Sequence, residues 1–421
     1  MPEGRTVTPP APEPVRLGLR VYLPTLLFGI GQGAIAPVVA LSALSLGASV
    51  SQAGLVVALL GVGQLLGDVP AGALAARLGE KRAMLSATAV AVVALVVCAV
   101  AGSVPVLAAA ITVNGFATAV WGLARQSYIT EVVPITHRAR VLSTLAGARR
   151  FGFFAGPFLG GALISVAGTQ SAYWIHVGTS LAAAAVLVAL PDKVVAPSAQ
   201  QRGRDVAVLS TWQVVRQHLP VLRRLGTAAV LVGATRASRQ AALPLWAAHI
   251  GLDASAASLV FGIAGFADVL LFYPAGKAMD VYGRRWIGVP SMLVLGVSLL
   301  LLPLAQAPSA FVAVAVLMGI GNGMSSGILM VLAADASPAH GRAQFLGAWR
   351  LCSDSGNGAG PLVLASVAAA LSLGPALVAM GVVGLSAAAA LHRWIPPTPA
   401  RPGSSAATTA AATPAAQGRT T

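Results

Sequence analysis

The sequence predicts an all-α polytopic membrane protein with twelve transmembrane helices in two six-helix bundles. Three observations lead to this fold class. Of the 421 residues, 57% are hydrophobic and only 9% are charged, whereas an ordinary soluble domain has about 25% charged residues. Apolar runs of about 20 residues recur along the chain, each long enough to cross a hydrocarbon core as a helix. Finally, one pattern of polar residues between the runs occurs twice.

The apolar runs define twelve predicted spans. They are residues 21–43, 52–76, 83–102, 105–129, 141–166, 170–190, 225–248, 255–278, 286–305, 308–333, 344–370 and 374–394. The first run is too long for the apolar core of a cleavable signal peptide, so we expect it to remain as a membrane anchor.

Basic residues occupy every second connection between the spans. The connections near residues 44–51 and 306 contain no Lys or Arg, whereas those after the second and eighth spans are basic. By the positive-inside rule, both termini and the central segment are predicted to be cytoplasmic, in a multi-pass protein of the cell membrane. The net charge of +15 therefore belongs to the cytoplasmic face, and we expect no nucleic-acid partner.

The chain contains an internal repeat. The stretch PAGALAARLGEKR at Pro70–Arg82 is echoed by PAGKAMDVYGRRW at Pro274–Trp286, with Gly276 standing 204 residues after Gly72. The same offset pairs Gly61 with Gly265, Gly79 with Gly283, Gly115 with Gly319, Pro134 with Pro338, Gly152 with Gly356, Gly156 with Gly360, and Pro157 with Pro361. One offset over about a hundred residues predicts two parallel halves related by a pseudo-two-fold axis along the membrane normal.

This repeat gives the predicted domain organisation. We expect a cytoplasmic tail at residues 1–16, a first bundle at 17–190, a cytoplasmic linker at 191–224, a second bundle at 225–395 and a tail at 396–421. The last segment is of low complexity and is predicted to be disordered.

The repeated stretch resembles the signature of the major facilitator superfamily, G-x-L-x-D-R-x-G-R-K after helix two. The resemblance implies a secondary transporter whose two bundles rock against each other around a hinge or gate. The signature and its neighbourhood supply Asp68, Gly72, Arg77, Gly79, Lys81, Arg82, Gly276, Asp280, Gly283 and Arg284. We expect Gly72 to let a neighbouring helix approach closely and Gly79 to adopt a positive φ in a tight turn.

This chain departs from the signature at one position. The acidic residue of the signature falls on Ala76, whereas the second copy keeps Asp280. A latch between the bundles would therefore need another acid, and Asp68 and Glu80 are the candidates.

A second stretch, GFFAGPFLGG in the fifth span, is similar to the antiporter motif of the same superfamily. Its small residues and proline are Gly152, Gly156, Pro157, Gly160 and Gly161. The resemblance implies an exporter of drugs or other small molecules. The alternative is tight helix packing with no meaning for the direction of transport.

Several charges fall within the predicted spans, where each costs at least about 2.5 kcal/mol near the bilayer centre. Asp268 and Asp354 are the candidates for proton coupling, with purely structural pairing as the alternative. The candidates for lining a substrate cavity are Gln32, Arg150, Arg236 and Arg239. The shallower Asp68, Arg125, Arg149 and Arg350 are expected in a gate or in structural ion pairs, and the i,i+4 spacing of Arg350 and Asp354 favours a salt bridge.

The sequence thus favours a monomeric, proton-coupled exporter of small organic molecules in the lipid bilayer. An importer or organic-anion carrier of the same fold, or a membrane sensor, remains an alternative. No cluster of catalytic carboxylates, histidines or metal ligands marks one membrane face, and no Walker-type phosphate-binding loop occurs. We therefore expect no enzyme activity, no metal and no cofactor. The two cysteines, Cys98 and Cys352, lie inside separate spans and indicate neither a disulfide framework nor a metal site.

Overall fold

The computed structural model describes residues 22–132, 135–189, 211–338 and 342–395, and within these ranges it contains helices and no strand. The predicted tails and residues 191–210 of the predicted linker lie outside this part of the chain. Their limits therefore stay predictions.

The first half of the protein comprises seven helices that form six spans. They are α2 (Leu23–Ile35), α3 (Val38–Ser45), α4 (Val50–Leu78), α5 (Glu80–Ala99), α6 (Val104–Val132), α7 (Ile135–Ala167) and α8 (Ser171–Ala189). The helices α2 and α3 share one span, Leu23–Ser45. The break between them falls at Pro37, because proline lacks the N–H that a continuous helix needs.

The second half begins with three short elements and continues with the remaining six spans. The short elements are α9 (Thr211–Gln217), α10 (Leu219–Val221) and the π-helical η3 (Leu222–Gly226). The spans are formed by α11 (Thr227–His249), α12 (Ala254–Tyr282), α13 (Arg284–Leu301) with η4 (Leu302–Leu304), α14 (Pro308–Met324) with α15 (Ile328–Ala336), α16 (Arg342–Ala370) and α17 (Leu373–Trp394).

The helices confirm the predicted fold class. Ten segments of the described chain are long and apolar enough to cross a membrane. The helices α11 and α16, with 23 and 29 residues, complete the twelve. Both carry charges within their length, Arg236 and Arg239 in α11 and Arg350 and Asp354 in α16.

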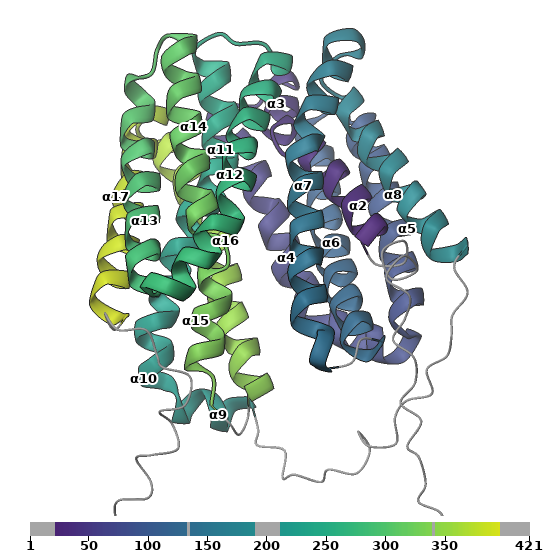
Figure 1. Ribbon diagram of the computed structural model, residues 1–421. Coiled ribbons are helices and arrows are strands. Elements are labelled where there is room, and N and C mark those ends of the chain that lie inside the picture. The colour runs from purple at the N-terminus through teal and green to yellow at the C-terminus, as the bar shows by residue number, and fades with distance from the viewer. Residues whose placement is uncertain (1–21, 133–134, 190–210, 339–341, 396–421) are drawn as a thin grey trace, which may run out of the picture.

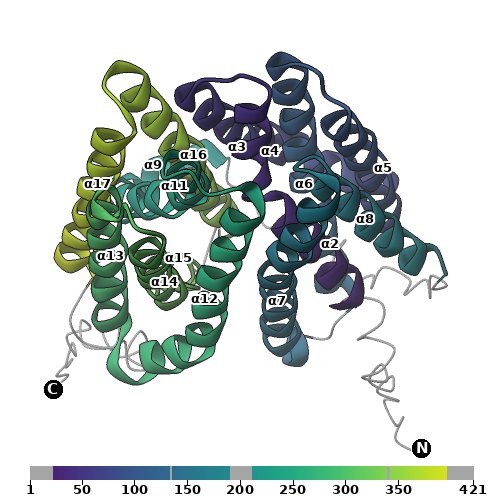
Figure 2. The same cartoon turned by 90° about the horizontal axis from the view of Figure 1, so that it is seen from above.

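The internal repeat of the sequence reappears in the packing. Figures 1 and 2 show the helices of the two halves as two groups side by side. In the first half α2 packs on α7 and α8, and α4 packs on α6. The equivalent helices of the second half repeat these contacts, because α11 packs on α16 and α17, and α12 packs on α14.

Glycines bring the backbones of α2 and α7 together. A Cβ atom added to Gly156 would overlap the backbone oxygen of Ile30, and one added to Gly360 would overlap that of Ala234. The glycines one turn earlier, Gly152 and Gly356, are in the same situation. The glycine stripe thus packs two helices closely in each half, whereas its meaning for the direction of transport stays a prediction.

The two signature turns have the predicted backbone geometry. Gly79 joins α4 to α5 with φ 80°, and Gly283 joins α12 to α13 with φ 95°, a region in which glycine meets no steric penalty. The expectation for Gly72 is wrong in this conformation, because a Cβ added there would meet only Leu123 Cδ2, at 4.0 Å. No helix backbone approaches the face of α4 that carries Gly72.

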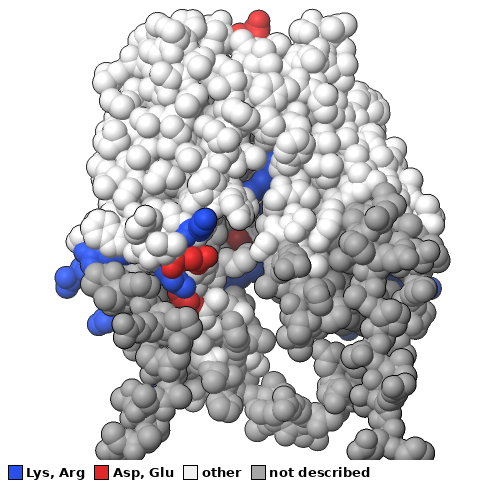
Figure 3. Space-filling view, viewed as in Figure 1, with Lys and Arg blue, Asp and Glu red and all other residues white. Residues whose placement is uncertain are grey.

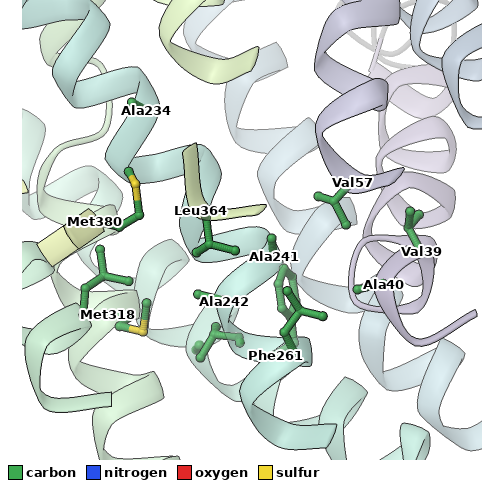
Figure 4. Close-up of a cluster of buried hydrophobic side chains, with 14 of the residues drawn as sticks. Val39, Ala40, Val57, Ala234, Ala241, Ala242, Phe261, Met318, Leu364 and Met380 are labelled. Carbon is green, nitrogen blue, oxygen red and sulfur yellow. The ribbon is translucent and has the colours of Figure 1, made fainter. Parts of the chain in front are cut away.

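The two halves meet along α4 with α16 and along α7 with α12, and α3 also packs on α11 and α12. Far from the Gly79 and Gly283 turns these contacts are mostly apolar, and Ser255 Oγ of α12 donates a hydrogen bond to the carbonyl oxygen of Gly161 in α7 at 2.9 Å. Figure 4 shows Val39 and Val57 of the first half and Phe261 of the second half in one buried cluster. The halves are therefore closed at this end of the helices.

Close backbone contact makes Gly156 sensitive to a single added carbon. We expect Gly156→Ala to destabilise the protein by about 1–3 kcal/mol, because the new methyl group must push α7 away from α2. Thermal unfolding in detergent measures the effect. Gly147→Ala on the same helix is the control, since a Cβ there meets nothing within 4 Å. Equal melting temperatures for both variants would contradict the packing described above.

Candidate functional site

Charged side chains from both halves gather between them, about midway along the helices. Figure 3 shows the surface hollowed between the halves, with blue and red side chains inside the hollow. The central charge cluster, as we call it, comprises Asp68 of α4, Arg149 and Arg150 of α7, Arg236 and Arg239 of α11, Asp268 of α12, and Arg350 and Asp354 of α16.

Asp268 is held by groups from both halves. Arg150 Nη1 of the first half lies 3.0 Å from Asp268 Oδ1. From the second half, Arg239 Nη2 lies 3.9 Å from Oδ2, and Asn322 donates its amide N–H to the same oxygen. Arg236 donates in turn to Asn322 Oδ1 at 3.0 Å. The Asp268 carboxylate thus interacts with two arginines directly and with a third through the amide of Asn322.

Aromatic rings cover the arginines of this group. The guanidinium carbon of Arg150 stands 4.5 Å from the ring centre of Phe272, and that of Arg239 stands 5.7 Å from the ring centre of Phe261. Such contacts favour a cation that has lost part of its hydration. The predicted cavity residues Arg150, Arg236 and Arg239 therefore form one connected group with the predicted coupling residue Asp268.

A second ion pair joins the halves between α4 and α16. Arg350 Nη2 lies 2.8 Å from Asp68 Oδ1, and its Nε lies 3.3 Å from Asp354 Oδ2. The predicted i,i+4 salt bridge is confirmed, and Asn357 also donates to Asp354, at 3.3 Å. We expected an acid that replaces the missing signature residue to link the two halves, and Asp68 makes such a contact. The other candidate, Glu80, accepts a hydrogen bond from Ser127 of its own half.

The fourth predicted cavity residue, Gln32, meets a different arginine. Gln32 Oε1 lies 3.4 Å from Arg149 Nη2. Nearby, Arg125 Nη1 of α6 lies 3.4 Å from Thr25 Oγ1, and its guanidinium stands 5.0 Å from the ring centre of Trp121. Neither Arg125 nor Arg149 forms an ion pair with any acid in the part of the chain that the structure describes. The expected structural ion pair is found for Asp68 and Arg350, but not for Arg125 and Arg149.

The signature residues lie away from the central charge cluster. Arg284 Nε forms an ion pair with Asp335 Oδ2 of α15 at 2.9 Å, within the second half. The side chains of Arg77, Arg82 and Asp280 are exposed. Their role in gating stays a prediction.

The sequence reasoning did not identify Asn322 and Phe272 as members of the site. Asn322 could have been noticed as the only amide side chain in the predicted span 308–333. Phe272 gave no comparable signal, because aromatic residues are common in membrane helices. Among the described residues, no group of three or more His, Cys, Asp or Glu lies close enough together to hold a metal ion.

Comparison with protein families agrees with the division of the chain into two halves. The model of the Major Facilitator Superfamily matches residues 21–237 and again residues 225–420. The chain belongs to this superfamily. The predicted resemblance is thereby confirmed.

Curated relatives of this superfamily member are themselves described only as transporters. An uncharacterised MFS-type transporter of Mycobacterium tuberculosis is 29% identical over 192 residues, which are 42% of this chain but only 28% of that relative. One from Methanocaldococcus jannaschii is 22% identical over 334 residues, 78% of this chain and 84% of that relative.

Solved structures show the same fold at low sequence identity. A D-xylose–proton symporter has a TM-score of 0.72 and 17% identity, with 91% of this chain and 98% of that chain covered. A nucleoside transporter has a TM-score of 0.72 and 14% identity, with 90% and 99% covered. At these identities the likeness concerns the fold alone.

The ion pair between Asp68 and Arg350 allows a test of coupling between the halves. We expect Arg350→Gln to lower the melting temperature more than Asp68→Asn does, because it leaves Asp68 and Asp354 near each other without a cation. The double-mutant cycle should give a coupling energy of about 0.5–3 kcal/mol.

The Arg284–Asp335 pair inside the second half provides the control for this experiment. Asp335 is 42% exposed at its side chain, compared with 19% for Asp68, so its cycle should give less than about 1 kcal/mol. Additive effects of the Asp68 and Arg350 substitutions would show that this pair does not hold the halves together.

Proposed function

We propose that this protein is a proton-coupled exporter of small organic molecules that works by alternating access. The observation that carries the proposal is the position of Asp268 between the halves. Its carboxylate contacts Arg150 across the interface and Arg239 on its own half. A change in the relative position of the halves therefore changes the number of cations beside this carboxylate.

Such a change alters the affinity of a carboxylate for a proton. A nearby arginine favours the ionised form, whereas an apolar environment favours the neutral form. When Arg150 moves away with the first half, Asp268 keeps fewer cationic partners. The proton and the conformation of the halves are then linked through one side chain. Asp354, paired with Arg350 on its own helix, is the second candidate for this role.

One feature supports export as the direction, and a second is shared by exporters and importers. The stretch Gly152–Gly161 resembles the antiporter motif, and it forms the close contact between α7 and α2. The halves are closed at the end remote from the Gly79 and Gly283 turns, and the basic residues of the chain indicate that these turns are cytoplasmic. A cavity open to the cytoplasm is the state in which an exporter receives its substrate.

The proposed orientation can be tested by labelling single cysteines. In a variant without Cys98 and Cys352, we expect cysteines at Ser49 and Gln306 to react with an impermeant maleimide added to intact cells. A cysteine at Ser198 should react only after the cells are opened. The reverse labelling pattern would overturn the orientation and, with it, the assignment of the open end to the cytoplasm.

Proton coupling through Asp268 can be tested in energised inside-out vesicles. A screen of toxic organic compounds against expressing cells first identifies a compound to which the protein gives resistance. Adding that compound should release protons from vesicles with wild-type protein, seen as recovery of a quenched acridine dye. We expect Asp268→Asn to abolish this recovery, because an amide keeps size and hydrogen bonding but cannot titrate.

The control variant for this experiment lies on the same helix. Asp253 caps the start of α12 by accepting a hydrogen bond from Ala256 N at 2.7 Å, and Asn can serve as the same cap. Asp253→Asn should therefore behave as wild type. Asp268→Asn should still exchange substrate in counterflow. If Asp268→Asn and Asp354→Asn both retain gradient-driven transport, these acids do not couple protons.

A further inference from the structure

Two arginines of the first half lie inside membrane-spanning segments without a negative partner among the described residues. Arg125 belongs to the candidate span Val104–Ile129, and Arg149 belongs to the candidate span Val141–Ala167. Both reach the same helix, because Arg125 contacts Thr25 and Arg149 contacts Gln32 of α2, each at 3.4 Å. An unpaired charge at membrane depth is unfavourable and marks a functional position. These two unpaired cations therefore need an anion to neutralise them, and the described part of the chain does not provide one.

The acids of the central charge cluster are already engaged. Asp268 lies between Arg150 and Arg239, and Asp68 and Asp354 both contact Arg350. Three carboxylates are thus shared by three arginines. The central charge cluster contains five arginines and three carboxylates, so no rearrangement inside it can give every arginine a carboxylate of its own.

Unused hydrogen-bond donors lie beside the two arginines. Arg125 Nε and Trp121 Nε1 are buried and have no hydrogen-bond partner in the described structure. Trp121 itself is only 2% exposed. The side chain of Arg149 is exposed to solvent, and its one hydrogen bond, to Gln32, is 3.4 Å long. A planar guanidinium with free N–H groups is suited to bind carboxylate or phosphate oxygens.

An aromatic stack forms one side of this region. The rings of Phe28 and Trp121 are stacked with centres 4.3 Å apart, and His176 meets Phe28 edge-on at 5.2 Å. The guanidinium of Arg125 lies over the Trp121 ring. Both rings are at most 3% exposed, so the stack supports the Arg125 guanidinium from the core of the first half.

We infer that the substrate is an organic oxyanion, a carboxylate or phosphate ester, whose charged group binds Arg149 and Arg125 beside Gln32. This inference rests on the proposed transport function, since it names the substrate class of the same cavity. Because Arg149 is next to Arg150 in α7, the bound anion also reduces the repulsion between these two cations.

Binding to the purified full-length protein in detergent tests the substrate class without a proton gradient. The probes are benzoate and phenyl phosphate, their neutral counterparts benzamide and benzyl alcohol, and the cation benzylamine. Calorimetry and the thermal shift on ligand addition measure the affinity. We expect the two anions to bind, with benzamide, benzyl alcohol and benzylamine at least about tenfold weaker, because they lack charge-assisted hydrogen bonds.

Matched variants locate the site. Arg149→Gln and Arg125→Gln should each weaken anion binding about tenfold or more, whereas Arg149→Lys should lose less because it keeps the charge. Arg223→Gln is the control, since Arg223 is exposed in η3, and it should bind as wild type. Asp268→Asn should retain anion binding even where it loses proton exchange.

The outcomes separate this inference from the proposed function. Binding of no anion, equal binding of benzoate and benzamide by the wild type, or unchanged binding in both glutamine variants would overturn the inference. If anions bind as expected but no transported compound releases protons from vesicles, the proton-coupled function fails and the anion site stands. If only neutral or cationic compounds are exchanged for protons, the transport function stands and the anion site fails.

Discussion

Neutralisation of charge within the membrane is the constraint on which the rest of this structure depends. A lone charge at the bilayer centre costs at least about 2.5–3.5 kcal/mol, and here the compensation comes largely from the opposite half. Arg150 reaches Asp268 at 3.0 Å, and Arg350 reaches Asp68 at 2.8 Å. The contacts that make these charges tolerable are therefore the same contacts that join the halves midway along the helices.

The interior of each half is built differently from the interface between them. In α7 and α16, Gly156 and Gly360 place backbone against backbone, so a shift of either helix would create a clash or a void. Between the halves, most contacts join side chains, as apolar contacts near Val57 and Phe261 or as ion pairs, although the backbones of α4 and α16 also meet at Gly61 and Gly358. Such contacts can separate without disturbing a helix, which concentrates movement at the interface between two stiff halves.

The parts of this architecture that depend on local sequence could be predicted. The apolar runs gave the twelve spans, and the turns at Gly79 and Gly283 followed from the backbone freedom of glycine. Charge partners could not be predicted, because they depend on how each helix is rotated. Arg149 and Arg150 are neighbours in sequence, yet one contacts Gln32 and the other Asp268. The close approach expected at Gly72 failed for the same reason, since it required the position of another helix.

The internal repeat makes the two ion pairs between halves directly comparable. In both, the acid lies on the second span of one half and the arginine on the fifth span of the other. After the 204-residue offset, Asp68 stands four residues beyond the counterpart of Asp268, and Arg150 stands four beyond the counterpart of Arg350. Both shifts place the Asp68–Arg350 pair, between α4 and α16, nearer the open end than the Asp268–Arg150 pair. The difference is one helical turn, about 6 Å. A rotation that separates the halves from this end lengthens the Asp68–Arg350 pair more than the Asp268–Arg150 pair, so the repeat yields two contacts that respond to the same movement to different extents.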